Sequence, residues 1–563
     1  MSTVNRALFA ILIIGFVFLG LFLGSKIEKN FELNPVVADN ATTSVVVAGA
    51  APAFTDGPRE NPTSSTSTPT DAGLNVTFNA TATDANGDQY YLIVCSSATA
   101  TPNNNAAPSC AVGSTTWCVS GAVASGAANT CATTTNAGWT EINAWWGFAC
   151  DKSAGSQCSA GSQGTGEPGT PFMVNHKPNF ATISNDGPKD PGATITITAN
   201  ASDTDTASPD TVSLYICKSN DWTTTSNCGA GGQWCATTSK ASEPSCSFAI
   251  PDPQAHGNVT YYPYVKDNHN FGATGTVQGA AATFAVNDVA PTVSNVTIHG
   301  GEDIDVSLGG EGPTGNVSVT SSADVTDHNG CADLVSATSS FYTTEIDAAG
   351  CTATNANQCY YNTACSVNGS CQSSITYSYV CTSTFYYHAD PTDVGSYWES
   401  STWKSKVFAS DGSTMASSTV GTGRDLTSYT ALSVSSTINY GSLAIGDIAN
   451  GTALPKTASV YSSGNTGVDL NLSGGNMTGT ASTTATIAVG QQKYATSGVA
   501  YSAATALSGT PTGLTIGVLK TTTTASLSSK FSYWGLQIPT ATFADTYTGY
   551  VIFTAVKSAS STW

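Results

Sequence analysis

Alternation of hydrophobic and polar residues recurs along this chain and predicts β-strands from about residue 52 to the C-terminus. Successive side chains of a strand point to opposite faces, so each alternating run predicts a strand with one buried face. Outside the N-terminal segment no convincing amphipathic helix pattern occurs. Three of the runs begin similar stretches of sequence, with these residues on one face: Val76, Phe78, Ala80 and Ala82; Ile195, Ile197, Ala199 and Ala201; Val317, Val319, Ser321 and Ala323.

These three strands belong to copies of a repeated pattern. The sequences DGPR (56–59) and DGPK (186–189) precede the first two strands. Each strand is followed by an acidic turn and then by another strand, which ends at Cys95, Cys217 or Tyr342. A later strand in each copy ends with an aspartate, in FACD (148–151), YVKD (264–267) and FASD (408–411). Because the strands, the acidic turn and the late aspartate recur in the same order in all three copies, the sequence predicts tandem modules.

This order of an alternating strand, an acidic turn, an aromatic strand and a late aspartate resembles the Ig-like sandwiches of microbial surface proteins, namely PKD-like and cadherin-like modules. The resemblance covers about residues 52–428, although the cysteine-rich insertions between the third and sixth strands depart from it. It implies an all-β fold of tandem Ig-like β-sandwiches. Residues 429–563 lack cysteine and contain six further strand-like runs, so we expect a fourth sandwich there.

The predicted organisation has six parts. They are a membrane anchor or signal segment at 1–30, a linker or stalk at 31–51, module 1 at 52–175, module 2 at 176–288, module 3 at 289–428 and module 4 at 429–563.

The N-terminal segment 7–24 reads ALFAILIIGFVFLGLFLG and contains no charge. Eighteen residues of helix are just long enough to span a bilayer. A cleaved signal peptide has a shorter apolar core with a cleavage site directly after it, whereas Lys26, Glu28 and Lys29 follow here. An uncleaved transmembrane helix is therefore favoured over a signal peptide, and both remain open.

The sixteen cysteines occur in blocks of six, four and six, which predicts disulfides formed within each module in an oxidising compartment. No CxxC pair occurs and histidine is scarce, so metal thiolate sites are disfavoured. The simplest local connectivity pairs Cys95 with Cys110, Cys118 with Cys131, Cys150 with Cys158, Cys217 with Cys228, and Cys235 with Cys246. In module 3, Val-Asn-Gly between Cys365 and Cys371 favours their pairing. The partners of Cys331, Cys351, Cys359 and Cys381 stay open.

The charge of the chain and its motifs limit the classes of function that we expect. The chain has 38 acidic and 18 basic residues, a net charge of -20, which disfavours nucleic acid as a partner. No HExxH, GxSxG or Walker motif occurs, and Ser401 and Lys404 match SxxK only in a β-patterned stretch. The Leu-Pro-Lys-Thr-Ala sequence at 454–458 lacks the apolar tail of a sorting signal. We therefore expect no enzymatic activity; an unrecognised hydrolase is the least favoured interpretation.

The acidic turns are the candidate metal sites. In an Ig-like sandwich the loops after the second and sixth strands lie at one pole, so the acidic side chains of each module should meet there. Several oxygen ligands with few basic neighbours suit calcium, whereas ordinary Asx turns are the simpler alternative. The predicted ligands are Asp84, Asn86, Asp88 and Asp151 in module 1, Asp203, Asp205 and Asp267 in module 2, and Asp324, Asp327 and Asp411 in module 3.

The leading interpretation is a structural cell-surface protein, membrane-anchored or secreted, within a surface layer or an extended appendage. Its expected partners are other copies of itself or other envelope proteins, and the membrane through the N-terminal helix. The alternative is an adhesin that recognises a glycan or a partner protein. Aromatic groups at 145–148, 261–264 and 386–387 could form a glycan platform, although core packing explains them more simply.

Overall fold

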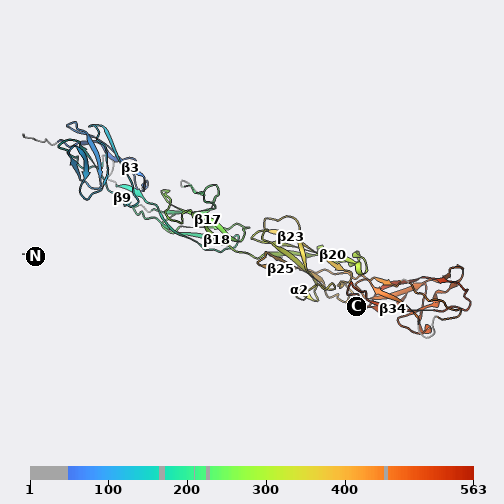
Figure 1. Ribbon diagram of the computed structural model, residues 1–563. Coiled ribbons are helices and arrows are strands. Elements are labelled where there is room, and N and C mark those ends of the chain that lie inside the picture. The colour runs from blue at the N-terminus through green and yellow to red at the C-terminus, as the bar shows by residue number, and fades with distance from the viewer. Residues whose placement is uncertain (1–48, 164–170, 208–209, 224–227, 436, 449–453) are drawn as a thin grey trace, which may run out of the picture. The chain divides into compact units, whose positions relative to one another are not determined.

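The computed structural model describes residues 49–563, except 164–170, 208–209, 224–227, 436 and 449–453. β-strands dominate these residues, and their one α-helix is the four-residue α2 (Asp347–Gly350) (Figure 1). The all-β prediction is confirmed. The predicted anchor at 7–24 lies outside the described residues, and no helix within them is long and apolar enough to cross a membrane.

The chain divides into two compact units. Unit 1 comprises the described residues of 49–63, 75–134 and 143–172. Unit 2 comprises 64–74, 135–142 and 173–563, and so contains modules 2, 3 and 4. Three segments predicted as part of module 1, namely 64–74, 135–142 and 173–175, therefore belong to unit 2.

Unit 1 is an antiparallel sandwich of two three-stranded sheets, ordered β1-β3-β8 and β10-β4-β7, with an inserted hairpin β5-β6. Alternation along β3 buries Val76, Phe78, Ala80 and Ala82. Phe78 packs against Trp145, with 4.9 Å between the ring centroids. The strands are β1 (Ala53–Glu60), β3 (Asn75–Thr83), β4 (Tyr90–Cys95), β5 (Ala100–Asn103), β6 (Ala106–Cys110), β7 (Thr116–Val119), β8 (Ala128–Thr134) and β10 (Trp146–Asp151).

Module 2 pairs a three-stranded sheet, β12-β13-β16, with a four-stranded sheet, β15-β14-β17-β18. The first, second and fifth strands thus face the third, fourth, sixth and seventh, which is an Ig-like sandwich arrangement. The core includes Ile195, Leu214 and Phe284. Strand bounds are β12 (Asn179–Asn185), β13 (Thr194–Ser202), β14 (Val212–Cys217), β15 (Gln233–Lys240), β16 (Ser245–Ala249), β17 (Gly257–Asp267) and β18 (Ala282–Val286). Short strands β2 (Thr70–Asp71) and β9 (Ile142–Asn143) flank β11 (Phe172–Asn175).

Module 3 forms one seven-stranded sheet, β19-β20-β23-β22-β21-β24-β25. Strand β22 pairs with β21 over its first part and with β23 over its last, and so connects two sets of strands that would otherwise be separate sheets. The strands are β19 (Thr292–Ile298), β20 (Asn316–Thr326), β21 (Ser336–Thr343), β22 (Cys359–Val367), β23 (Thr376–Tyr386), β24 (Trp403–Ser410) and β25 (Met415–Thr419).

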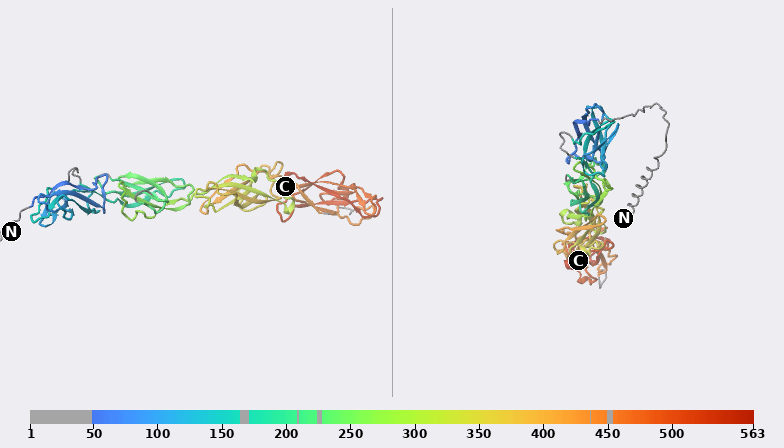
Figure 2. Two further views of the ribbon diagram at one scale, coloured as in Figure 1. Left: turned by 90° about the horizontal axis from the view of Figure 1, so that it is seen from above. Right: turned by 90° about the vertical axis from the view of Figure 1, so that its left-hand side faces the viewer.

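Module 4, for which a fourth sandwich was expected, contains three sheets, β26-β27-β34-β31-β32, β33-β28-β36 and β30-β29-β35, drawn in orange to red in Figure 2. Its core contains Val460, Leu470 and Trp534. The strands are β26 (Leu432–Val434), β27 (Lys456–Ser462), β28 (Val468–Gly474), β29 (Met477–Gly479), β30 (Thr486–Ile487), β31 (Gln492–Ala495), β32 (Thr505–Ala506), β33 (Thr512–Val518), β34 (Ser529–Leu536), β35 (Tyr547–Thr548) and β36 (Val551–Lys557).

All sixteen cysteines form disulfides within their own modules. The five pairs predicted for modules 1 and 2 are confirmed. The predicted Cys365–Cys371 pair is wrong, because Cys365 lies directly opposite Cys381 on neighbouring strands and bonds to it. Cys371, in the connecting loop, bonds to Cys331, and Cys351 bonds to Cys359.

Candidate metal centres

The end of module 2 brings together acidic side chains from two parts of the chain, the loop between β13 and β14 and the end of β17. Asp203 and Asp205 follow β13, and Asp210 precedes β14. Carboxylate oxygens of these three aspartates all lie within 4.8 Å of one another. Asp267, the last residue of β17, is close enough for its charge to interact with Asp203. The predicted meeting of the second-strand and sixth-strand loops therefore occurs here.

Two oxygens at this acidic pole have no hydrogen-bond partner among the described residues. They are Asp203 Oδ2 and Asn175 Oδ1, both shielded from solvent. The Asn175 side chain is fully buried, and its amide nitrogen donates to Asp267 Oδ2 at 3.1 Å and to Asp71 Oδ1 at 2.8 Å. Unpaired buried oxygens carry a desolvation cost that a bound cation would remove.

Burial and mutual repulsion disfavour ionisation at this pole. Burial, with a smaller contribution from the charge of Asp203, raises the pKa of Asp267 to about 6. Burial likewise raises the pKa of Asp203 and of Asp210. No lysine or arginine forms an ion pair with these acids within the described part of the chain. Two histidines lie beside them: His176 Nδ1 is 2.6 Å from Asp205 Oδ1, and His269 Nε2 is 3.1 Å from Asp210 Oδ1.

Module 1 has a smaller version of this arrangement. The turn after β3 places Gly87 at a φ of 77°, in the left-handed region that glycine adopts readily, and Asp84 Oδ1 accepts from the backbone N–H groups of Asn86 and Asp88. Burial raises the pKa of Asp151, and the charges of Asp84 and Asp88 add to the effect. The buried atoms Asp84 Oδ2 and Asp151 Oδ2 have no hydrogen-bond partner in the described structure. Asn86 Oδ1 instead accepts from the Ala50 backbone.

In module 3 the predicted ligand set has to be corrected. Asp324 lies within β20, not in the turn, and accepts hydrogen bonds from Asn295 Nδ2 and Ser378 Oγ. Asp327 follows the strand and is fully buried, with Oδ2 unpartnered among the described residues. Burial raises the pKa of Asp327, and the charges of Asp333, Asp411 and Asp288 raise it further.

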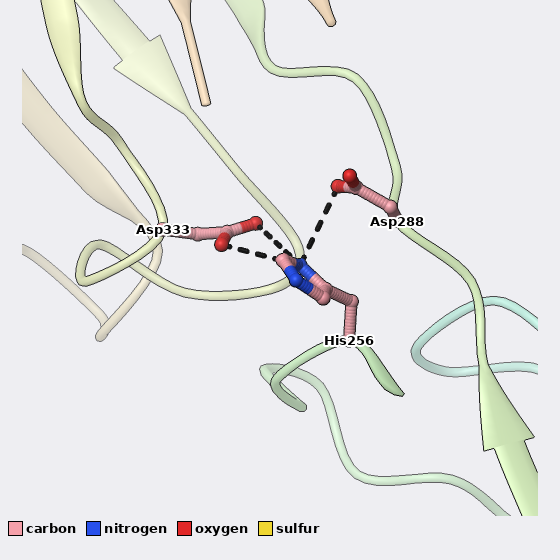
Figure 3. A group of neighbouring side chains, drawn as sticks. All are labelled: His256, Asp288 and Asp333. Carbon is pink, nitrogen blue, oxygen red and sulfur yellow. Dashed lines mark hydrogen bonds and ion pairs between the residues drawn. The ribbon is translucent and has the colours of Figure 1, made fainter. Parts of the chain in front are cut away.

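A second group of ligand-type side chains lies where modules 2 and 3 join (Figure 3). His256 precedes β17, Asp288 follows β18, and Asp333 follows the disulfide-bonded Cys331. His256 Nδ1 lies 3.2 Å from Asp333 Oδ1 and 3.6 Å from Asp288 Oδ1. Asn329 fixes the same junction: its Oδ1 accepts from the Val289 backbone, and its Nδ2 donates to the carbonyls of Gln254 and Asn287.

Sequence reasoning missed Asn175, Asp210 and the His256 group. Asp210 lies next to a predicted strand, so a broader search of strand ends would have included it, whereas Asn175 ends a strand, β11, that was not predicted. His256, Asp288 and Asp333 are separated in sequence and adjacent only because two modules meet, which no local pattern signals.

The aromatic groups mainly form the core. Trp145, Tyr261 and Tyr387 are almost fully buried, which contradicts a glycan platform built on these residues. Tyr264 stacks on Trp222 with 4.9 Å between the ring centroids, and Tyr386 stacks on His388.

No protein-family model and no curated protein matches the chain. Solved structures with some likeness include the EC3-6 cis-dimer of protocadherin gammaB7, with 12% identity and a TM-score of 0.28, over 82% of this chain and 92% of that one. The full ectodomain of mouse nectin-like molecule 4 has 7% identity and a TM-score of 0.27, over 64% and 96%. Three N-terminal domains of the outer capsid protein Hoc of bacteriophage RB49 have 11% identity and a TM-score of 0.17, over 67% and 98%. At these TM-scores, the fold assignment rests on the strand order described above.

Proposed function

We propose that the chain is a non-enzymatic structural protein of the cell surface, and that its copies assemble through module 4 into a surface layer or an appendage. The eight disulfides fit an oxidising, extracellular environment. The observation that carries the proposal is a groove in module 4 that is lined by both apolar and polar residues, beside an open strand edge.

The groove has a volume of about 1000 Å³. It is lined by residues of the five-stranded sheet, such as Val434 and Leu536, and by residues in or beside β36, such as Tyr550 and Phe553. At its rim Phe543 is 63% exposed and Tyr550 is 61% exposed. Among the described strands β36 pairs only with β28, so its other edge is available for an added strand.

The charge distribution favours a second copy of the chain as the occupant. Residues 429–563 contain five lysines and three aspartates, a net charge of +2. The preceding 428 residues contain 13 basic and 35 acidic residues, a net charge of -22. Module 4 of one copy is thus complementary in charge to the earlier modules of another, and such a heterologous contact propagates into chains rather than closing as a dimer.

Two phenylalanines provide a matched test. Phe543 lies at the groove, whereas Phe531 is 53% exposed on β34 and does not line it. We call the fragment 31–563, which lacks the predicted N-terminal anchor, the ectodomain. In it, Phe543→Lys should abolish assembly seen by light scattering and electron microscopy, and Phe531→Lys should preserve it. Equal effects of the two substitutions, or a parent protein that stays monomeric at every concentration tried, would refute assembly through the groove and favour an isolated adhesin.

We also propose that the acidic pole of module 2 binds calcium. Asp203, Asp205, Asp210 and Asp267 with Asn175 Oδ1 supply enough oxygens for most of the six to eight ligands that calcium takes. The two unpartnered oxygens support this proposal. The pole of module 1, with Asp84, Asp88 and Asp151, is a second and smaller candidate.

Calcium binding should raise the unfolding temperature of the ectodomain. At a hundredfold excess over the Kd, a bound ion stabilises the folded state by about 2.7 kcal/mol. Asp203→Asn should remove most of this gain. Asp186→Asn changes an exposed aspartate of the same module, paired with Lys189, and should leave the gain intact. If melting of the parent is insensitive to calcium, the acids only form turns.

A further inference from the structure

We propose that His256, Asp288 and Asp333 form a site for a divalent transition metal, with zinc as the best match, and that the ion links modules 2 and 3. This site is separate from the proposed calcium pole and shares no residue with it. Its donor set of one imidazole nitrogen and two carboxylates suits zinc and disfavours calcium, which takes oxygen ligands.

The two separations measured from His256 fit a tetrahedral ion. Ligand atoms bound to zinc at 2.0 to 2.1 Å in tetrahedral geometry lie about 3.3 Å apart. His256 Nδ1 lies 3.2 Å from Asp333 Oδ1 and 3.6 Å from Asp288 Oδ1, and the three ligand atoms all lie within 4.8 Å of one another. Figure 3 shows both carboxylates directed at the same side of the imidazole. Small side-chain movements would therefore complete the coordination.

Two oxygens without a hydrogen-bond partner support a cation here. Asp288 Oδ1 is shielded from solvent and accepts no hydrogen bond among the residues described, and His256 Nδ1, at 3.6 Å, makes an ion-pair contact with it. Asp327 is fully buried, with its Oδ2 likewise unpartnered, and its charge interacts with those of Asp333, Asp288 and Asp411. A positive ion in this cluster would offset the repulsion, and the His256 side chain, 43% exposed, leaves a path for the ion and for a water ligand.

The site would join three segments. His256 lies within module 2, and Asp288 is the last residue of that module. Asp333 lies in module 3, in the loop that the Cys331–Cys371 disulfide fixes. The backbone there is already held by Asn329, so the ion would restrain a junction that is nearly in place.

A neighbouring pair supplies the matched control. His328 Nδ1 lies 2.9 Å from Asp252 Oδ2 at the same junction, and its side chain is 45% exposed, close to that of His256. His328 is not one of the three residues of the proposed zinc site. His256→Gln should therefore remove the site, and His328→Gln should not.

The test uses the whole ectodomain (31–563), with zinc measured by titration calorimetry and cobalt as a spectroscopic probe. We expect one zinc ion that excess calcium does not displace, and visible cobalt bands typical of tetrahedral nitrogen and oxygen ligation. Since loss of an outer partner alone costs 10- to 100-fold in metal affinity, His256→Gln or Asp333→Asn should weaken binding about 100-fold or more, with His328→Gln unchanged.

Three results would overturn the proposal: no zinc binding by the parent, equal zinc affinity in His256→Gln and the parent, or displacement of zinc by an equal concentration of calcium. Melting without metal verifies that each variant is folded. Since Asp203→Asn should leave zinc binding intact, failure of the calcium proposal and failure of this one are distinguishable.

Discussion

At the scale of single residues, Asp267 links the acidic pole of module 2 to pH. Burial raises its pKa to about 6 from 3.8, so the folded protein binds this proton more tightly than the unfolded chain. Protonation therefore favours folding, and the free energy of unfolding of calcium-free protein should rise as the pH falls from about 7 to 4. The stabilisation is lost as the pH rises through 6, and this difference between the folded and unfolded pKa is worth about 3 kcal/mol at most.

Thermal denaturation of calcium-depleted ectodomain between pH 7.5 and 5 tests this. Asp267→Asn should flatten the dependence, because the substituted amide does not titrate in this range. An unchanged slope in Asp267→Asn would assign the effect to other groups.

A buried ion pair makes another residue-scale prediction. Lys520 Nζ lies 2.8 Å from Asp390 Oδ1, both side chains are almost fully buried, and Lys520 also donates to Asn357 Oδ1. Lys520→Met leaves Asp390 without its cation, so it should lower the free energy of unfolding by about 3 to 5 kcal/mol in urea titrations. The double variant Lys520→Met/Asp390→Leu should recover most of the loss. A double variant as unstable as the single one would indicate a packing defect instead of an unpaired charge.

Residue patterns predicted part of the candidate site because some of its members follow strands. Asp203, Asp205 and Asp267 could be placed at one pole from strand order alone. Asn175 could not, because its role depends on being buried beside Asp267 and Asp71, and burial of a polar side chain is decided by tertiary packing.

At the scale of elements, period-two alternation identified most long strands, including β3, β13 and β20. It placed the end of β20 too early, because Asp324 looks like a turn residue. Asn295 and Ser378 donate to its carboxylate, which lets the strand continue to Thr326. Short strands such as β29, β31 and β35 were missed, since two to four residues cannot display a period.

Strand register yields the disulfide prediction. Sequence proximity favoured Cys365 with Cys371, but pairing of β22 with β23 sets Cys365 opposite Cys381. Non-reducing peptide mapping of the ectodomain should find Cys365–Cys381 and Cys331–Cys371 and no free thiol. A Cys365–Cys371 peptide would contradict the register of these two strands, and a bridge between modules would contradict the division into modules.

At the scale of the whole molecule, modules 3 and 4 are tied by more than a linker. The Lys520–Asp390 pair and the hydrogen bond from Asn357 Nδ2 to the Thr522 carbonyl both cross their boundary. Cutting the chain at residue 428 would thus leave Asp390 without its cation and damage module 3. Point substitutions at the groove are accordingly a cleaner probe of assembly than truncation.

The proposed contact predicts how a defective copy behaves among normal ones. In a heterologous contact the groove of one copy binds a different surface of the next. A Phe543→Lys chain has lost its groove but keeps that other surface, so it should still join the growing end that presents a free groove and then stop growth. One part of Phe543→Lys in ten should shorten assemblies of the parent ectodomain in electron micrographs, whereas Phe531→Lys at the same ratio should not. If groove met groove in a closed dimer, the Phe543→Lys chain would be excluded, and the length of parent assemblies would not change.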